Sequence, residues 1–231
     1  MTGLGCVTAL GGDTASTWEA LCDGRSARGP LTAIAVEGCR VTAGAQATLP
    51  SWPPWPEKRL RRLSRSARLA LPAAREALAQ AQLLDPNERC TLPRLEMSVS
   101  TTACGMEKGE QFLRALWGGD RTGQSARVTH YQSQAQIGAI HDAFGFDGPV
   151  MTVANACAGG GNAIGHAADL IRAGLTDIVL AGGYEALSEL VFAGFDGLQS
   201  LAPDACRPFD RGRRGLMLGE GAAFLVLEKT D

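Results

Sequence analysis

The segment from Val150 to Gly174, VMTVANACAGGGNAIGHAADLIRAG, joins a strand pattern directly to a helix pattern. Residues 148–154 are a short, largely apolar run of the kind that is typical of a buried strand. In residues 161–174 the apolar side chains recur at helical spacing and share one face. Such a strand-to-helix unit is the building block of layered α/β folds. It also places Cys157 at the junction, where open α/β sheets bind their ligands.

The same alternation of strand and helix patterns extends along most of the chain. Residues 2–12 are predicted to be the end of a short strand that runs into a glycine-rich loop. Further strands are predicted at 96–102, 148–154, 176–183 and 215–229, and helices at 14–24, 60–78, 106–119, 131–145 and 161–174. Residues 25–58 are predicted to be a loop, because the stretch LPSWPPWPEK carries four prolines that interrupt regular structure. The alternation predicts an α/β fold with a largely parallel sheet.

Composition narrows the class of protein. Hydrophobic residues make up 45% of the 231 residues and charged residues 20%, which is typical of a folded globular chain. The formal net charge of -2 gives no electrostatic reason to expect nucleic-acid binding. The seven cysteines lack zinc-site spacing, and a chain of this length needs no disulfides, so we expect a reducing compartment. With no N-terminal signal pattern and no run of about 18 apolar residues, we expect a cytoplasmic protein without a membrane span.

Cys157 has a physical reason to be reactive at this position. A helix N-terminus presents unpaired N–H groups and a partial positive charge, and both stabilise a thiolate. Gly159, Gly160 and Gly161 allow a sharp turn and leave room for a substrate beside the sulfur. The arrangement parallels the strained nucleophile elbow of hydrolases. The alternative is a small buried side chain, which is the usual place of a free cysteine. A phosphate-binding loop is disfavoured, because GGGNAIG does not match the glycine spacing of nucleotide-binding motifs.

Three blocks of the sequence resemble the β-ketoacyl synthases, the decarboxylating condensing enzymes of fatty-acid and polyketide synthesis. The blocks are TGLGCVTALGGDTASTWEALCDG, ANACAGGGNAIGHAADLIRAGLTDIVLAGGYEAL and CRPFDRGRRGLMLGEGAAFLVLEK. They occur in the order and spacing of the family, and residues 25–95 are loosely similar. The resemblance implies a thiolase-like layered α/β/α/β/α fold, of which residues 1–231 form the N-terminal half with a mostly parallel mixed sheet. It also implies that the C-terminal half of that fold lies outside these residues.

The resemblance assigns Cys157 the role of the acyl-accepting nucleophile. Its own backbone N–H would then be one donor of the oxyanion hole. In the implied reaction Cys157 takes an acyl group from a carrier-protein thioester, a malonyl thioester loses CO2, and the resulting carbanion attacks the acyl-enzyme. The implied partners are an acyl carrier protein and a second ketosynthase-like chain, in a homodimer or a heterodimer. Neither a cofactor nor a metal is implied.

Elongating members of the family use two histidines from the C-terminal half, and the three histidines of this chain do not replace them. His166 follows Cys157 by nine residues, which is roughly 13 Å along a helix and about half a turn out of phase. His130 and His141 are predicted to be polar residues on helix surfaces. The alternative function is therefore a catalytically silent or split-subunit partner of a condensing enzyme. A thiolase or a cysteine hydrolase is disfavoured by the RPFD-to-GEG block.

Other charged residues have structural interpretations. Glu220 in the GEG motif is predicted to be a structural carboxylate that accepts hydrogen bonds. The arginines of the 59–68 helix face are predicted to be solvated. The resemblance implies an alternative role for the arginines of this face, which is to bind an acidic acyl carrier protein.

Overall fold

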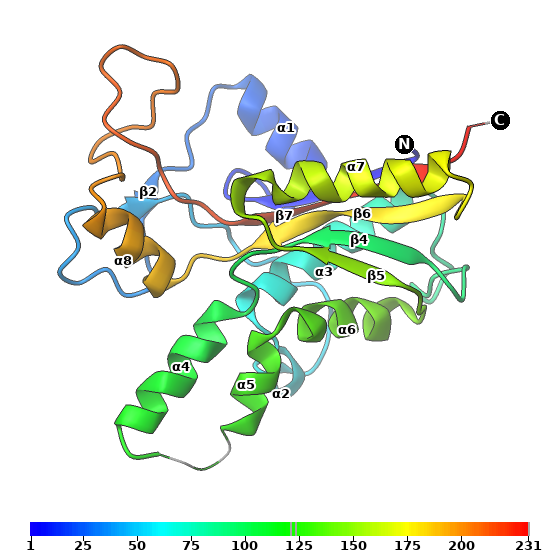
Figure 1. Ribbon diagram of the computed structural model, residues 1–231, viewed down its shortest axis with the longest axis horizontal. Helices are drawn as coiled ribbons and strands as arrows, with labels where there is room; N and C mark the ends of the chain where they lie inside the picture. Colours follow the sequence, from blue (N-terminus) through cyan, green and yellow to red (C-terminus); the bar gives the residue numbers. More distant parts are fainter. Residues whose placement is uncertain (121, 123, 231) are drawn as a thin grey trace.

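The computed structural model describes residues 1–230 except 121 and 123, and a five-stranded sheet forms its centre (Figure 1). The strands are β1 Gly3–Thr8, β4 Glu96–Ser100, β5 Val150–Val153, β6 Ile178–Glu185 and β7 Gly221–Glu228. Their order across the sheet is β1-β7-β6-β4-β5. β4 pairs in parallel with β5 and β6, while β7 pairs antiparallel with β6 and β1. All the strands except β7 therefore point the same way, and the predicted α/β fold with a mostly parallel mixed sheet is confirmed.

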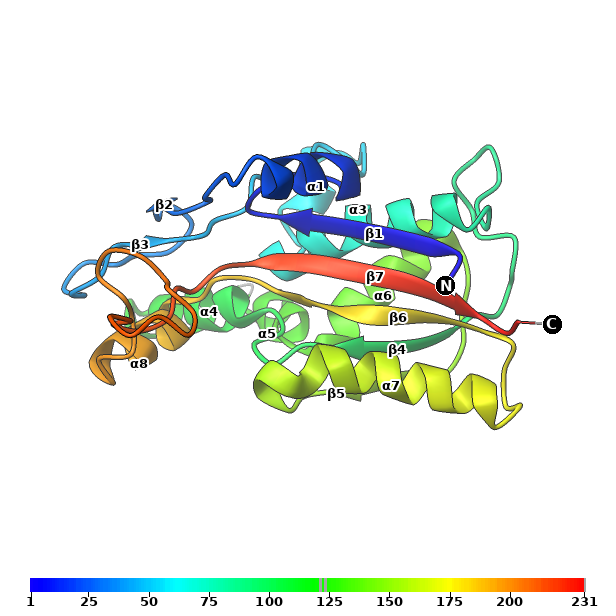
Figure 2. The ribbon, with the colours of Figure 1, turned by 90° about the horizontal axis from the view of Figure 1, so that it is seen from above.

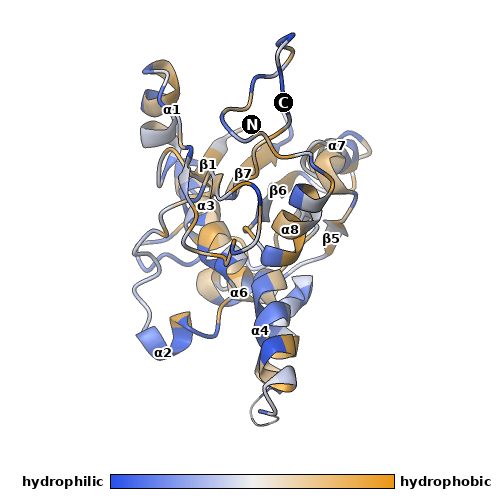
Figure 3. Ribbon diagram, turned by 90° about the vertical axis from the view of Figure 1, so that its left-hand side faces the viewer, coloured by the Kyte–Doolittle hydropathy of each residue, from blue (hydrophilic) through white to orange (hydrophobic). Residues whose placement is uncertain are grey.

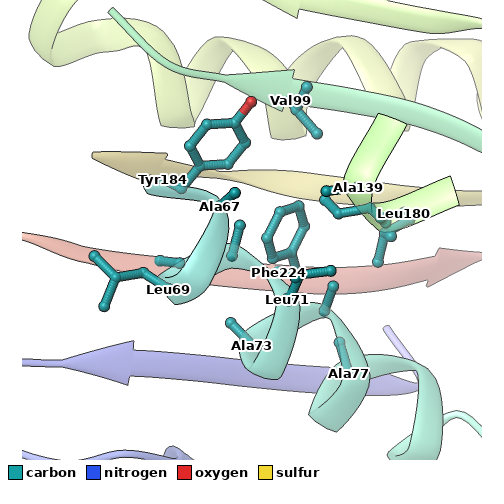
Figure 4. Close-up of a cluster of buried hydrophobic side chains, with 14 of the residues drawn as sticks. Ala67, Leu69, Leu71, Ala73, Ala77, Val99, Ala139, Leu180, Tyr184 and Phe224 are labelled. Atoms are coloured by element: carbon teal, nitrogen blue, oxygen red, sulfur yellow. The ribbon is translucent and has the colours of Figure 1, made fainter. Parts of the chain in front are cut away.

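Helices cover both faces of the sheet (Figure 2). α3 Arg65–Gln80 and α6 Ser133–Phe144 pack on one face. Their apolar side chains form the main core with those of β4, β6 and β7, and Leu71 lies near Phe224 at its centre (Figure 4). α7 Gly159–Arg172 packs on the opposite face, where Ala167 joins a smaller cluster with β6. The described residues thus form an α/β/α arrangement, in which the helix that follows Cys157 packs on the face opposite α3 and α6.

Local sequence explains where the helices on the β1 side begin. α1 Thr14–Cys22 starts after Asp13, whose carboxylate accepts a hydrogen bond from Ser16 N at 2.7 Å, as an N-cap residue does.

α3 lies close to β1, because Gly5 has no β-carbon. A β-carbon at Gly5 would overlap the carbonyl oxygen of Ala73. This close contact fixes α3 over the sheet.

The helix predicted from residue 60 begins later than expected. A short helix, α2 Glu57–Leu60, precedes it, and α3 starts only after Ser64. The Ser64 hydroxyl accepts a hydrogen bond from Ala67 N at 3.1 Å and so caps the new helix. The predicted loop before these helices contains the two-residue strands β2 Gly29–Pro30 and β3 Ala43–Gly44.

Arg65 corrects the prediction that the arginines of the 59–68 face are solvated. Its side chain is 17% exposed and forms an ion pair with Glu220, whose side chain is fully buried. The Glu220 carboxylate also accepts hydrogen bonds from Ala47 N at 2.9 Å and Leu187 N at 3.1 Å. The structural interpretation of Glu220 is therefore confirmed. Its carboxylate links Arg65 of α3 to the segments that contain Ala47 and Leu187.

Two helices form an arm that extends away from the sheet (Figure 1), and the longer one, α4, also projects in the view of Figure 3. They are α4 Met106–Trp117 and α5 Ser125–Tyr131, and neither contains a buried residue. α8 Glu189–Gly197 lies against α4, since Arg114 pairs with Glu189 and Leu190 N donates to Glu110 at 2.9 Å. The sequence patterns do not predict α5 or α8, because each is short and lacks a clear apolar repeat. In the part of the chain that is described, no helix is both long and apolar enough to cross a membrane.

Candidate functional site

Cys157 lies on a single 3-10 turn, η1 Ala156–Ala158, between the end of β5 and the first residue of α7. Its predicted position at a strand-to-helix junction is confirmed. The cysteine is exposed, so it is not the small buried side chain that was the alternative interpretation. The residue stands just before α7, whose first backbone N–H groups have no partner within the helix.

The residue before the cysteine has a strained backbone. Ala156 has a φ of 57°, in the left-handed region that costs a residue with a β-carbon roughly 1–2 kcal/mol. Strain of this kind gathers at functional sites, and a sharp strained turn is what presents the nucleophile in the elbow of hydrolases. Sequence patterns did not reveal the strain, because alanine carries no preference for this conformation.

Cys157 opens onto a cleft of about 440 Å³. The cleft lies at the edge of the sheet where β1, β4 and β6 end and β7 begins, which is the ligand-binding edge of open α/β sheets. The last residue of β1, β4 and β6 and the first residue of β7 all line the cleft: Thr8, Ser100, Glu185 and Gly221. The cleft thus collects residues from four distant parts of the sequence around one thiol.

Two serines of β4 hold the start of α7 in place. The Ser98 hydroxyl donates a hydrogen bond to the Ala163 carbonyl oxygen at 2.8 Å, and both groups are buried. The Ser100 hydroxyl lies directly against Gly159, where an added β-carbon would overlap it. Gly160 lines the cleft and has open space around its α-carbon. Gly159 therefore permits close packing beneath the cysteine, and Gly160 leaves the predicted room beside it. The prediction that these glycines form the sharp turn is wrong, because they lie within α7 and the left-handed residue is Ala156.

The outward face of α7 continues from the cleft and is uncovered. Gly161, Ile164 and Gly165 are exposed on this face, whereas Ala163 and Ala167 point to the sheet and are buried. Ile164 also lines the cleft. Cys157 and this small-residue face therefore form one continuous surface.

None of the three histidines lines the cleft. His166 lies on α7, which is helical from Gly159 to Arg172, so the predicted separation along the helix applies to it. His141 lies on α6, on the other face of the sheet, and corrects the surface prediction: its ring packs edge-on against Phe146, and its Nε2 is buried. His130 lies in the last turn of α5. In the described part of the chain, no histidine stands ready to act with Cys157.

The chain matches one protein-family model over all of its 231 residues. The model of the β-ketoacyl synthase N-terminal domain matches residues 1–231. The chain belongs to the β-ketoacyl synthase family. The resemblance drawn from the three sequence blocks is thereby confirmed, and Cys157 occupies the block that carries it.

The chain is also similar in sequence and in structure to individual named proteins. Nodulation protein E of Rhizobium sp. (strain N33) is 39% identical over 234 residues, which cover 100% of this chain and 58% of that protein. The 3-oxoacyl-[acyl-carrier-protein] synthase 2 of Staphylococcus aureus is 33% identical over 239 residues, covering 100% of this chain and 59% of that protein. A solved structure, the ishigamide ketosynthase/chain length factor, has a TM-score of 0.85 at 29% identity over 99% of this chain and 57% of that one.

These ketosynthase relatives are longer than the chain. It spans 58% of the length of the first nodulation protein and matches a family model that describes an N-terminal domain. The chain is thus similar to the N-terminal part of each relative. The surface formed by Cys157 and α7 belongs to that part.

Proposed function

We propose that this ketosynthase chain accepts an acyl group on Cys157 from a carrier-protein thioester. The observation that carries the proposal is the exposed thiol on a strained turn, at a helix N-terminus and over an open cleft. The thiolate sulfur attacks the thioester carbonyl, the carbonyl oxygen takes the negative charge, and the carrier thiolate leaves with the electrons of the broken C–S bond. The backbone N–H of Cys157 itself is the first donor that we assign to the oxyanion.

The acyl-enzyme is the electrophile of the second step. A malonyl thioester loses CO2, and the carbanion that remains attacks the carbonyl carbon held by Cys157. The new C–C bond replaces the C–S bond, so the Cys157 thiolate is released with a β-ketoacyl carrier as the product. Decarboxylation requires groups that stabilise the developing enolate, and none of the three histidines of this chain lines the cleft. We therefore assign the first step to these residues and the second to the complete synthase.

The carrier protein that we propose as partner is acidic, and a cationic surface fits it. Three cations form no ion pair with any carboxylate among the described residues: Arg62 in the turn before α3, Arg68 in the first turn of α3 and Lys108 on α4. The pKa of Lys108 is lowered by burial, and the charges of Arg127 and Arg68 add to this despite the opposing charge of Glu107. Such unpaired positive charge attracts and orients an acidic partner.

A second ketosynthase-like chain is the other partner that we propose. β5 pairs only with β4 among the described strands, so its outer edge leaves backbone groups unpaired. Met151 on this strand is 49% exposed. The arm adds apolar surface, with Trp117 80% exposed and Leu113 44% exposed. A homodimer or a heterodimer would cover these features.

The alternative function is a silent or split-subunit partner of a condensing enzyme. The absence of histidines from the cleft favours it, and the exposed, strained cysteine turn favours the acyl-accepting function. The two functions differ in one measurable property, which is covalent transfer of an acyl group to Cys157.

The test is intact mass spectrometry of the full chain after incubation with a dodecanoyl-carrier thioester. We expect the wild-type chain to gain one acyl group and Cys157→Ser to gain none. Cys206 is also exposed, so Cys206→Ser is the matched control and should be acylated like the wild type. Acylation of Cys157→Ser to the wild-type extent, or no acylation of either chain, would contradict the proposal.

A second prediction separates loading from condensation. With malonyl-carrier thioester, we expect the same preparation to release little CO2 even when Cys157 is acylated, because no histidine lines the cleft. Release of CO2 is measured with carboxyl-labelled malonyl thioester. Sustained turnover by the chain alone would show that the decarboxylating groups lie within these residues.

A further inference from the structure

Glu185 ends β6 at the cleft and holds the loop that follows β4. The Thr101 hydroxyl and Thr102 N each donate a hydrogen bond to Glu185 Oε1 at 2.6 Å. Ala103 N donates to Oε2 at 3.0 Å. One carboxylate therefore receives donors from three successive residues of a segment that lies more than 80 positions earlier in the sequence.

These bonds decide what Glu185 does in the cleft. Both carboxylate oxygens already accept hydrogen bonds from the loop, and hydrogen bonds to an ionised acceptor are among the strongest in proteins. Oε1 receives two of these bonds and Oε2 receives the third, so the carboxylate is the point at which three successive residues of the loop are attached. Its role is therefore to hold the loop.

The loop that Glu185 holds is a wall of the Cys157 cleft. Ser100 and Thr102 both line the cleft, and Ser100 also supports Gly159 beneath the cysteine. Thr101 is almost fully buried, and its hydroxyl accepts a further hydrogen bond from Cys104 N at 3.1 Å.

The same loop carries backbone strain. Cys104 has a φ of 53°, a left-handed conformation that a residue with a β-carbon keeps only when its surroundings hold it there. The hydrogen bonds to Glu185 and Thr101 hold it on one side, and the bond from Gly105 N to Tyr131 O at 2.9 Å holds it on the other. Without them, the segment would relax and the wall would move.

We propose that Glu185 is a positioning residue that fixes the wall formed by residues 100–104 and thereby limits the size of the group that reaches Cys157. The inference rests on the proposed acyl-accepting function of that thiol. Side chains that hold a site in this way act through hydrogen bonds to the residues that form it.

The test compares two maleimides, one small (N-methyl) and one bulky (N-pyrenyl), because maleimides alkylate a thiol whether or not it accepts acyl groups. The readout is the ratio of the two alkylation rates at Cys157, measured on the full chain by peptide mapping. In Glu185→Ala we expect this ratio to shift towards the bulky reagent by about fivefold, as for the loss of one net hydrogen bond. In Glu185→Gln, which keeps an acceptor oxygen for the loop, the ratio should stay near the wild-type value.

Cys22 on α1 is exposed in the same chain, and its ratio of rates is the internal control. Thr101→Val is the second variant, since it conserves shape and removes both the donor to Glu185 and the acceptor of Cys104 N. It should shift the Cys157 ratio in the same direction by about twofold, and it decides the matter if Glu185→Ala does not fold. Unchanged Cys157 ratios in folded variants, or equal shifts at Cys22, would overturn the inference. A shifted ratio in a chain that accepts no acyl group would contradict only the proposed function.

Discussion

Replacing Glu220 by alanine should lower the free energy of unfolding by about 3–5 kcal/mol, the usual cost of removing one partner from a buried ion pair. Arg65 would be left largely buried without a carboxylate, and it now donates to Glu220 Oε2 from Nε at 2.8 Å. Ala47 N and Leu187 N would also lose their acceptor. Urea unfolding followed by circular dichroism measures the effect.

Two variants make this prediction specific. Glu57 forms an exposed ion pair with Arg61 on α2, so Glu57→Ala should cost no more than about 1 kcal/mol. The double variant Arg65→Met with Glu220→Leu removes both charges together, and it should be more stable than Glu220→Ala alone because no unpaired charge remains buried. If Glu220→Ala cost as little as Glu57→Ala, the carboxylate would not be the structural hub that we describe.

Gly159→Ala should damage both the fold and the reactivity of Cys157. The new methyl group would overlap the Ser100 hydroxyl, and overpacking of this kind costs about 1–3 kcal/mol. The start of α7 would be pushed away from β4 and would carry the neighbouring cysteine with it. Misplacement of a reacting group by about 1 Å reduces rates by up to 100-fold, so we expect acylation of Cys157 to slow by at least tenfold.

The matched control for Gly159→Ala is Gly161→Ala on the same helix. No atom lies near the position of a β-carbon at Gly161, and alanine favours helix more than glycine does, so stability should be unchanged or slightly higher. Ser100→Ala combined with Gly159→Ala should recover part of the lost stability, because the hydroxyl that clashes is gone. Equal stability and acylation rates for Gly159→Ala and Gly161→Ala would contradict this account of the close contact.

Features set by neighbouring residues could be predicted from the sequence. The strand before Cys157 and the helix after it follow from local periodicity, and both were placed within a few residues of their observed bounds. The arrangement of the strands depends on contacts between distant segments. β1 and β7 pair antiparallel although Gly3 and Val226 lie at opposite ends of the chain, and nothing in either strand pattern indicates that direction.

The same limit explains two residues, one in the fold and one at the cleft, whose roles the sequence patterns did not indicate. Arg65 has the spacing of a solvent-facing residue, yet its partner Glu220 lies 155 positions away. Glu185 likewise bonds to a loop whose nearest donor, Ala103, lies 82 positions earlier. Such pairs become visible only when the sheet brings β4, β6 and β7 together. Cys157 could be singled out because its surroundings, a strand end and a glycine-rich helix start, are contiguous in the sequence.

The most direct test of the central claim is a competition among the exposed thiols of the full chain. Cys22, Cys157 and Cys206 are all exposed, so accessibility alone would distribute an acyl group among them. With a limiting amount of dodecanoyl-carrier thioester, followed by proteolysis and mass spectrometry, we predict that the acyl group is found on the peptide that contains Cys157. Acylation spread over all three cysteines would show that the strained turn at the start of α7 gives Cys157 no special reactivity and would contradict its assignment as the nucleophile.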